Sequence, residues 1–554
     1  MTDIELVFIL LSVVAAITLV SRRIGVPYPI LMVVGGLLLG IIPGSPLHIE
    51  LEPEMVLLVF LPPILFSAAY LSSPRELWHN VRPISLLAVG LVVITTAAVA
   101  IVAMVLVPDL GWPLAAALGA IVSPPDAIAA TTIARRLHLP RRLVVIFEGE
   151  SLVNDATALT FYGLAVGAIG VATVTVPGVA IRFGFVALGG VLIGFVVGRA
   201  AVWLLRQLDD SPVEVLLTLL TPFAAYLPAD QLGVSGVLAT VAAGLFVGWH
   251  SPRIMTSSTR VLGMATWQMV VFVVNGLAFL LVGLQLPTVL GDIEGYEPIE
   301  LLGMAAAVCL TVIVVRLVWI FPATYVPRML FPAIARRDPA PPARLPLILG
   351  WGGMRGAVSL AAALALPHQI DGVELEGRGL MIFLTFSVIL VTLVGQGLTL
   401  PPLIRALGVS DEGASEEEEI HARTVAAEAA LVRLAELRAE APGHLPLIEQ
   451  LLKRYEHITE HLVAGRAASD EAAHGPADGS AADGTDAADD AGDAGDRELT
   501  PKEQEEMEHD EIRRAVIAAE RDAVLALRDS GEIGDDALHV IERDLDLDEL
   551  RREA

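Results

Sequence analysis

The chain has 554 residues, of which 55% are hydrophobic, and a formal net charge of −27. Its mean hydropathy of +0.67 lies far above that of soluble globular proteins, so the composition indicates an integral membrane protein. The negative charge argues against nucleic acid as a partner. The single Cys309 excludes an intrachain disulfide and a metal cluster held by thiolates.

Long apolar windows, separated by polar or Pro/Gly breaks, predict about thirteen membrane spans. Their approximate limits are 4–20, 28–44, 55–71, 84–107, 113–133, 143–169, 175–205, 213–229, 232–249, 265–288, 300–324, 345–367 and 379–403. The first window has no basic segment before it and no evident cleavage pattern, which favours a retained span over a signal peptide. The predicted fold class is an all-α polytopic membrane protein.

The arginines predict how these spans are oriented. One set of alternate loops is rich in Arg, as at Arg22, Arg135 and Arg336, and the other set is rich in acids. Arg-rich loops of membrane proteins lie in the cytoplasm. The N-terminus is therefore predicted outside the cell, and the C-terminal region in the cytoplasm, with the protein in the plasma (inner) membrane.

The negative charge belongs mainly to the C-terminal region. Forty of the acidic residues follow residue 410, against fifteen basic residues. We predict a transmembrane domain at 1–410, a cytoplasmic helical segment at 411–466, an acidic disordered linker at 467–497 and a helical hairpin at 498–554. Pro442 predicts a break in the helical segment, and the Ala/Gly/Asp-rich composition predicts the linker. Two interpretations of this tail remain open, a structural appendage and a regulatory domain.

The sixth predicted span contains an unusually polar run that begins at Phe147 and reads Phe-Glu-Gly-Glu-Ser-Leu-Val-Asn-Asp. At a helical rise of 1.5 Å per residue, Glu148 lies roughly 8 Å from the cytoplasmic surface and Asp155 roughly 18 Å from it, near the midplane. An Asp at this depth costs roughly 2.5 to 3.5 kcal/mol, so such residues usually face a cavity, a partner charge or a transported ion. The sequence therefore indicates a functional role for Asp155.

Two other predicted spans contain helix-breaking sequences near the same depth. The fifth contains Ser123-Pro-Pro-Asp126, and the twelfth contains Gly-Gly-Met-Arg355-Gly. Backbone groups freed at membrane depth are tolerated only inside protein or along a cavity, and broken helices can form cation sites there. The two spans run in opposite directions, as expected for an inverted repeat with a midplane site. Asp126 either binds the ion or caps the second half-helix.

Helical periodicity divides the polar side chains of the sixth span between two faces. Glu148, Ser151 and Asp155 share one face, which we assign to an ion cavity. Glu150 lies on another face and is predicted to form a structural ion pair with Arg355. Glu148 is either a charge in an entry funnel or a solvated residue near the membrane surface.

Six segments together resemble the monovalent cation/proton antiporters of the sodium/proton exchanger type, bacterial branch. They are Phe147 to Tyr162, Ser123 to Ala130, Gly352 to Leu366, Phe60 to Phe66, Asn275 to Gln285 and Gly395 to Pro402. The resemblance covers residues 1 to 405. The combination of Glu-Ser-x-x-Asn-Asp with Gly-Gly-x-Arg-Gly-Ala is specific.

This resemblance implies an inverted-repeat homodimer whose protomers each combine a dimerisation part with a core part containing two crossed, broken helices. It implies that Asp155 carries the proton and the cation in turn, and that Ser151 contributes an oxygen ligand. By the same analogy Asn154 belongs to the ion- and proton-binding site and stabilises the broken-helix region, and Glu150 pairs with Arg355. The Asn-Asp pair at 154 and 155 is expected to give electroneutral exchange, one ion for one proton.

The sequence departs from the family pattern at two places. Several relatives have Thr-Asp-Pro where this chain has Pro125-Asp126-Ala127, so that Ser123 or backbone carbonyl groups would replace a Thr hydroxyl as ion ligand. Many relatives have an acid after the Pro-Pro run of the third span, where this chain has Ser67-Ala68. These differences bear on the choice of cation.

The predicted function is secondary active exchange of a monovalent cation, Na⁺ in the first place, for H⁺. A carboxylate in a dehydrated cavity binds either a proton or a small cation, and this competition enforces exchange. Exchange of K⁺ for H⁺ by the same mechanism is the alternative. No enzymatic activity and no cofactor are expected, and the predicted partners are the transported ions, the lipid bilayer and a second copy of the chain.

Two functions of other classes are disfavoured. An intramembrane aspartyl protease would use Asp126 and Asp155, but the sequence lacks the Tyr-Asp and Gly-x-Gly-Asp contexts of such enzymes. A passive channel would need polar groups spread along a pore rather than gathered at one depth.

Overall fold

A computed structural model describes residues 3–24, 26–42, 53–169, 175–285, 296–367, 369–370, 373–374, 377–409, 414–472 and 501–553. The chain divides into two compact units. The first comprises Met1–Met255 and Gly263–Asp411, and the second comprises Thr256–Leu262 and Glu412–Ala554. Residues 473–497 of the predicted acidic linker lie outside the described residues.

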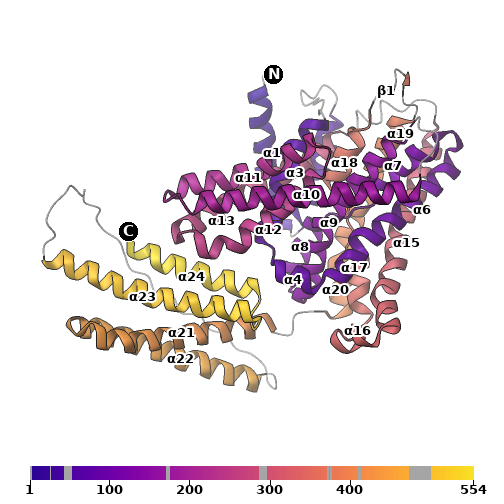
Figure 1. The fold of residues 1–554 in the computed structure, drawn as a ribbon. Coiled ribbons are helices and arrows are strands. Elements are labelled where there is room, and N and C mark those ends of the chain that lie inside the picture. Colours follow the sequence, from indigo (N-terminus) through magenta and orange to yellow (C-terminus); the bar gives the residue numbers. More distant parts are fainter. Residues whose placement is uncertain are drawn as a thin grey trace. The chain divides into compact units, whose positions relative to one another are not determined.

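The first unit is built mainly of helices, with short 3₁₀ and π-helices labelled η (Figure 1). Its first half contains α1 (Asp3–Ile24), α2 (Tyr28–Gly40), α3 (Pro53–Leu71), α4 (Pro74–His79), α5 (Val81–Ser85), η1 (Leu86–Leu91), α6 (Val92–Leu106), η2 (Pro108–Leu110), α7 (Trp112–Val122), α8 (Ala127–Arg136) and α9 (Arg141–Val166). Its second half contains α10 (Val176–Leu205), α11 (Ser211–Gln231), α12 (Gly236–Ile254), α13 (Ser257–Leu284), α15 (Pro298–Leu330), α16 (Pro332–Arg337), α17 (Arg344–Trp351), α18 (Ala357–Leu364), α19 (Arg378–Leu390), η3 (Val391–Gln396) and α20 (Gly397–Leu407). Strands β1 (Gln369–Ile370) and β2 (Val373–Glu374) form a small antiparallel hairpin.

Eight stretches of helix among the described residues are long and apolar enough to cross a membrane. Two shorter apolar helices, Tyr28–Gly40 and Leu58–Leu71, add to them. The predicted all-α membrane fold is confirmed in this form, whereas the count of thirteen spans stays a prediction.

The helix breaks expected in the fifth and twelfth spans are present. Helix α7 ends at Val122 and α8 begins at Ala127, and α17 ends at Trp351 while α18 begins at Ala357. In each case the chain continues as a second helix after a few irregular residues. Proline lacks the N–H that a helix interior needs, and glycine favours non-helical backbone, so both sequences destabilise the helix at these points.

Small residues allow the long helices to approach closely. Helix α10 packs along α12, and a Cβ atom at Gly194 would collide with the carbonyl group of Ala239. Helix α12 in turn packs against α3, where a Cβ atom at Gly248 would collide with the carbonyl group of Tyr70. Such contacts are typical of membrane helices, whose association depends on close packing of small residues.

The second unit contains four long helices, which lie side by side in Figure 1. They are α21 (Ala414–Glu440), α22 (Leu445–Ala472), α23 (Pro501–Ser530) and α24 (Asp535–Glu553), with η4 (Pro442–His444) between the first two. The break predicted at Pro442 is thus present, and α22 includes the first residues of the predicted linker. The helices bury their apolar faces against one another, with side chains such as Leu434, Ile448, Val524 and Leu538 at the centre.

Residues Thr256–Leu262 belong to this second unit, so that the first residues of α13 are part of it while the rest of α13 belongs to the first unit. Arg260 forms an ion pair with Asp546 of α24, and Arg521 of α23 donates to Ser257 at 3.2 Å and to Asp546 at 2.8 Å. The first turns of α13 are therefore bound to helices α23 and α24 by charge-assisted hydrogen bonds.

Candidate functional site

The two broken helices meet at their breaks. The backbone N–H of Asp126, after α7, donates to the carbonyl oxygen of Met354, after α17, at 2.7 Å. Asp126 also caps α8, because its Oδ1 accepts from the N–H of Ile128 at 2.8 Å. A Cβ atom at Gly356 would collide with the Asp126 carboxylate, so this position of the crossing requires glycine.

Arg355 lies fully buried at this crossing, and its guanidinium donates to backbone carbonyl groups. Its Nε donates to Val122 O at 3.1 Å and its Nη2 to Ser123 O at 3.4 Å, and it also donates to Gly353 O. The carbonyl groups at the end of a helix carry partial negative charge and need donors. Arg355 therefore satisfies the end of α7, where no further turn of helix can do so.

The predicted ion pair between Glu150 and Arg355 is wrong, because Glu150 pairs with Arg316 of α15. The two Nη atoms of Arg316 donate to the two oxygens of Glu150 at 2.5 and 2.9 Å. Arg316 also donates to Leu349 O at 3.0 Å, and both side chains of the pair are buried. Helix α15 packs against α17, and this packing brings Arg316 within reach of α9. The result is a fork-to-fork pair of the strongest geometry.

Two polar side chains of α9 bind the first break. The Nδ2 of Asn154 donates to Pro125 O at 2.9 Å, and the Oγ of Ser151 accepts from the N–H of Ala127 at 3.4 Å. Asn154 is fully buried. The irregular backbone between α7 and α8 is thus hydrogen-bonded to α9, as backbone at membrane depth must be.

A cavity of about 180 Å³ lies beside this crossing and brings together oxygen-bearing residues of three segments. The polar residues that line it at this depth are Asp126, Ser151, Asp155 and Asn275. Asp155 is 6% exposed and Asn275 is 2% exposed. Carboxylate, hydroxyl and amide oxygens together can replace the water shell of a small cation.

The cavity extends to Glu148 and Arg135, which form an ion pair at 2.8 Å. The Arg135 side chain is 62% exposed and that of Glu148 is 25% exposed, so this pair marks the solvent-accessible end of the cavity. The Glu148, Ser151 and Asp155 positions of α9 therefore line the cavity from its accessible end to its buried end.

Two residues predicted to bind the ion or the proton, Ser123 and Asn154, do not line the cavity, whereas Asn275, to which the sequence assigned no role, does. Ser123 is buried and its Oγ donates to Ala120 O at 2.9 Å, away from the residues that line the cavity. Asn275 lines the cavity, and its Oδ1 is buried without a hydrogen-bond partner in the described part of the chain. The sequence signal for Asn275 was an amide alone in an apolar run.

The model of the transmembrane sodium/hydrogen exchanger family matches residues 9–406. The chain belongs to this family. A Na⁺/H⁺ exchanger of Mycobacterium tuberculosis, itself uncharacterized, is 33% identical over 98% of this chain and 95% of its own length. The Na⁺/H⁺ antiporter ApNhaP of Aphanothece halophytica is 34% identical over 76% of each chain.

One further relative and one solved structure are also similar to this exchanger. The sodium, potassium, lithium and rubidium/H⁺ antiporter of Bacillus subtilis is 32% identical over 72% of this chain and 61% of its own length. Among solved structures, the sodium proton antiporter MjNhaP1 from Methanocaldococcus jannaschii matches with a TM-score of 0.57 at 18% identity, covering 73% of this chain and 98% of its own. The membrane unit of this exchanger therefore has the fold of that antiporter.

Proposed function

We propose that this sodium/hydrogen exchanger carries a monovalent cation, Na⁺ in the first place, across the plasma membrane in exchange for H⁺, with Asp155 binding the two ions in turn. The observation that carries the proposal is the contrast between two acids of α9. Glu150 is neutralised by Arg316, whereas Asp155 lines the cavity and has no hydrogen bond or ion pair to any described residue.

Exchange follows from this arrangement by competition. A buried carboxylate without a protein cation is stable only when a proton or a metal cation neutralises it. The loaded site can cross the low-dielectric region, but the empty charged site cannot. Exchange is electroneutral when Asp155 alone trades one proton for one cation. The neighbouring Asn154 is not titratable, and the Asp126 carboxylate, which caps α8, keeps the same charge in both steps.

The cation ligands we propose are the oxygens of Asp155 and Ser151 of α9, together with those of Asp126 and Asn275 from the other segments that line the cavity. These hard oxygen ligands fit Na⁺ and K⁺ alike. The names of the relatives support both ions, since one is a Na⁺/H⁺ antiporter and another an antiporter of sodium, potassium, lithium and rubidium. Exchange of K⁺ for H⁺ is therefore the second candidate function.

The assembly and orientation form part of the same proposal. The resemblance to the family supports a homodimer. The alternation of Arg-rich and acid-rich loops supports an external N-terminus and a cytoplasmic tail. No cofactor is needed for this mechanism beyond the transported ions.

The test uses purified protein in proteoliposomes with an imposed pH gradient, and follows lumenal pH after addition of Na⁺, K⁺ or Li⁺. We expect cation-dependent dissipation with the wild type and none with Asp155→Asn. Ser123→Ala is the matched control, because Ser123 lies outside the cavity and this variant should keep transport. Transport by Asp155→Asn at the wild-type rate would overturn the proposal. An imposed membrane potential should leave the rate unchanged if exchange is electroneutral.

A further inference from the structure

Three arginines converge on one carboxylate at the ends of three helices. Asp338, directly after α16, accepts from Arg82 of α5 at 2.5 Å, from Arg142 of α9 at 2.8 and 3.0 Å, and from Arg328 of α15 at 2.7 Å. We call these four residues the arginine cluster. Its arginines belong to loops that the positive-inside rule assigns to the cytoplasmic side.

The charges of the arginine cluster do not balance. Partial burial acts to raise the pKa of Asp338, but hydrogen bonds and charges from Arg142 and Arg328 hold that pKa well below its usual range, so the carboxylate stays ionised. Within the described residues, Arg82, Arg142 and Arg328 have no second acidic partner. One carboxylate facing three guanidinium groups leaves two positive charges uncompensated, and the Arg142 side chain is 44% exposed.

An apolar cavity adjoins these charges. Its volume is about 80 Å³, and all three arginines line it. Its remaining walls are mainly apolar, with Leu87 and Ile320 among them.

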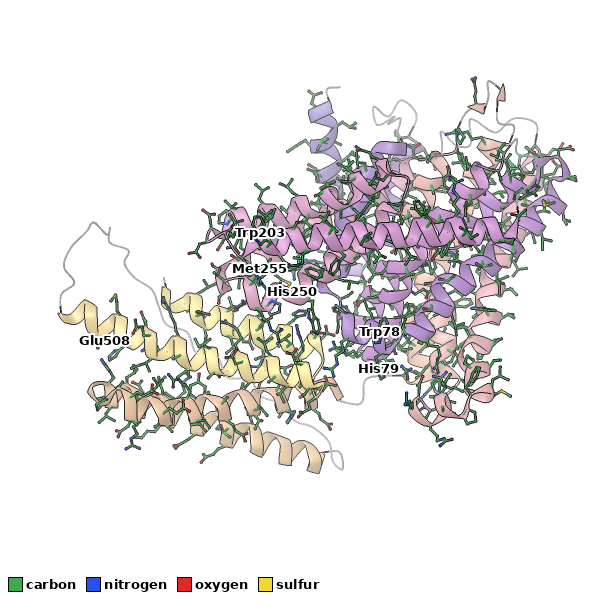
Figure 2. The ribbon with its side chains drawn as sticks, in the orientation of Figure 1. Trp78, His79, Trp203, His250, Met255 and Glu508 are labelled. Atoms are coloured by element: carbon green, nitrogen blue, oxygen red, sulfur yellow. The ribbon has the colours of Figure 1, made fainter. Side chains whose placement is uncertain are left out.

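Helix α4 indicates where the cavity lies relative to the membrane surface. Trp78 of α4, four residues before Arg82, is 77% exposed, and Figure 2 shows it beside His79 on this turn of the chain. Exposed Trp side chains are enriched at the boundary between membrane and water. A cationic rim over an apolar cavity at that level matches an amphiphile with an anionic head.

We propose that this cavity binds an anionic phospholipid, with the lipid phosphate on the arginine cluster and part of an acyl chain against the apolar wall. Guanidinium groups bind phosphate oxygens in the same bidentate geometry as they bind carboxylates. A soluble phosphate would use the rim and leave the apolar wall exposed, which favours the lipid. The bound lipid would connect the ends of α5, α9 and α15, so it should stabilise the membrane unit. This site is separate from the Asp155 cavity, and the proposal does not depend on the ion transported.

The test compares lipids on the purified full-length protein. The protein is transferred to mixed micelles of detergent and phosphatidylcholine with increasing amounts of phosphatidylglycerol, and retained lipid is counted by native mass spectrometry. Thermal unfolding is measured in parallel. We expect one phosphatidylglycerol retained per chain and a higher unfolding midpoint, with no such effect of inorganic phosphate at the same concentration.

Three variants distinguish lipid binding at this site from a general attraction of the protein to anionic lipids. Arg142→Gln should weaken phosphatidylglycerol binding about fivefold, the effect of one arginine near a membrane surface. Arg206→Gln is the matched control, because Arg206 is exposed, lies on a loop of the same predicted side and does not line the cavity. Ala323→Phe fills the cavity without changing its charge, and should also release the lipid.

Three outcomes would overturn the proposal. The first is equal lipid retention by Arg142→Gln and Arg206→Gln. The second is wild-type retention by a folded Ala323→Phe variant. The third is stabilisation by inorganic phosphate as large as that by phosphatidylglycerol, which would assign the cluster to a soluble anion.

Discussion

The ion pair between Glu150 and Arg316 makes a strong prediction about stability. Replacing Glu150 by Leu leaves the Arg316 charge buried without a counterion, beside the equally buried Arg355. Removing one partner of a buried ion pair typically costs about 3 to 5 kcal/mol. Arg316→Met should cost about the same, because it leaves the Glu150 carboxylate buried and unpaired.

The double variant is the informative one. Glu150→Leu combined with Arg316→Met removes both charges and fills their space with apolar groups, a replacement that is often neutral or stabilising in other proteins. We therefore expect the double variant to be more stable than either single variant, with a coupling free energy of about 2 kcal/mol or more.

Stability would be measured as the free energy of unfolding of the purified protein in mixed micelles with increasing SDS. The control combines Glu150→Leu with Gly303→Ala, an open position in α15, and the two effects should add. If the effects of Glu150→Leu and Arg316→Met also add, the reasoning is refuted, since two charges that neutralise each other cannot be removed independently.

Three further predictions address the site, the helix packing and the tail. Asn154→Ala removes the buried hydrogen bond to Pro125 O, so it should lower the free energy of unfolding by about 1 to 3 kcal/mol and slow exchange in proteoliposomes. An unchanged exchange rate together with an unchanged unfolding midpoint would contradict this. Gly194→Ala places a Cβ atom against a carbonyl of α12 and should cost about 1 to 3 kcal/mol in SDS unfolding, whereas Gly303→Ala, which meets no atom, should cost little. Burial raises the pKa of Glu542 from 4.5 to about 7, although nearby arginines oppose the shift. Because the folded tail binds this proton more tightly than the unfolded tail, the tail is most stable below pH 4.5. Its free energy of unfolding should fall by about 3 kcal/mol as the pH rises through 7. Glu542→Gln should remove this loss, seen as greater protease resistance of the tail than wild type at pH 8 and similar resistance at pH 5; equal resistance at both pH values would count against it.

Much of the site could be predicted from local sequence. The double proline after Ser123 and the glycines around Arg355 favour helix breaks, because proline lacks the backbone N–H and glycine destabilises a helix. Local sequence is not sufficient, since the Pro62-Pro63 pair lies inside α3. The four-residue spacing of Ser151 and Asp155 assigns them to one face of α9 by helical geometry alone.

The partners of the buried charges could not be predicted in the same way. Arg316 lies far from Glu150 in the sequence, and only the tertiary packing of α15 brings the two together. Arg355 was a reasonable partner for Glu150 by depth, but the carbonyl groups at the end of α7 bind it instead. The sequence predicts how deep each residue lies along the membrane normal, but the choice of partner also depends on its position in the membrane plane.

By itself, the sequence determined the helical membrane architecture and the position of Asp155 and favoured the two breaks, because hydropathy, helix breaking and helical periodicity act over a few residues. The tertiary structure alone decided that Glu150 pairs with Arg316, that Ser123 lies outside the cavity and that Asn275 lines it. These facts depend on contacts between helices distant in sequence, where the geometry of packing selects among partners that the sequence leaves equivalent.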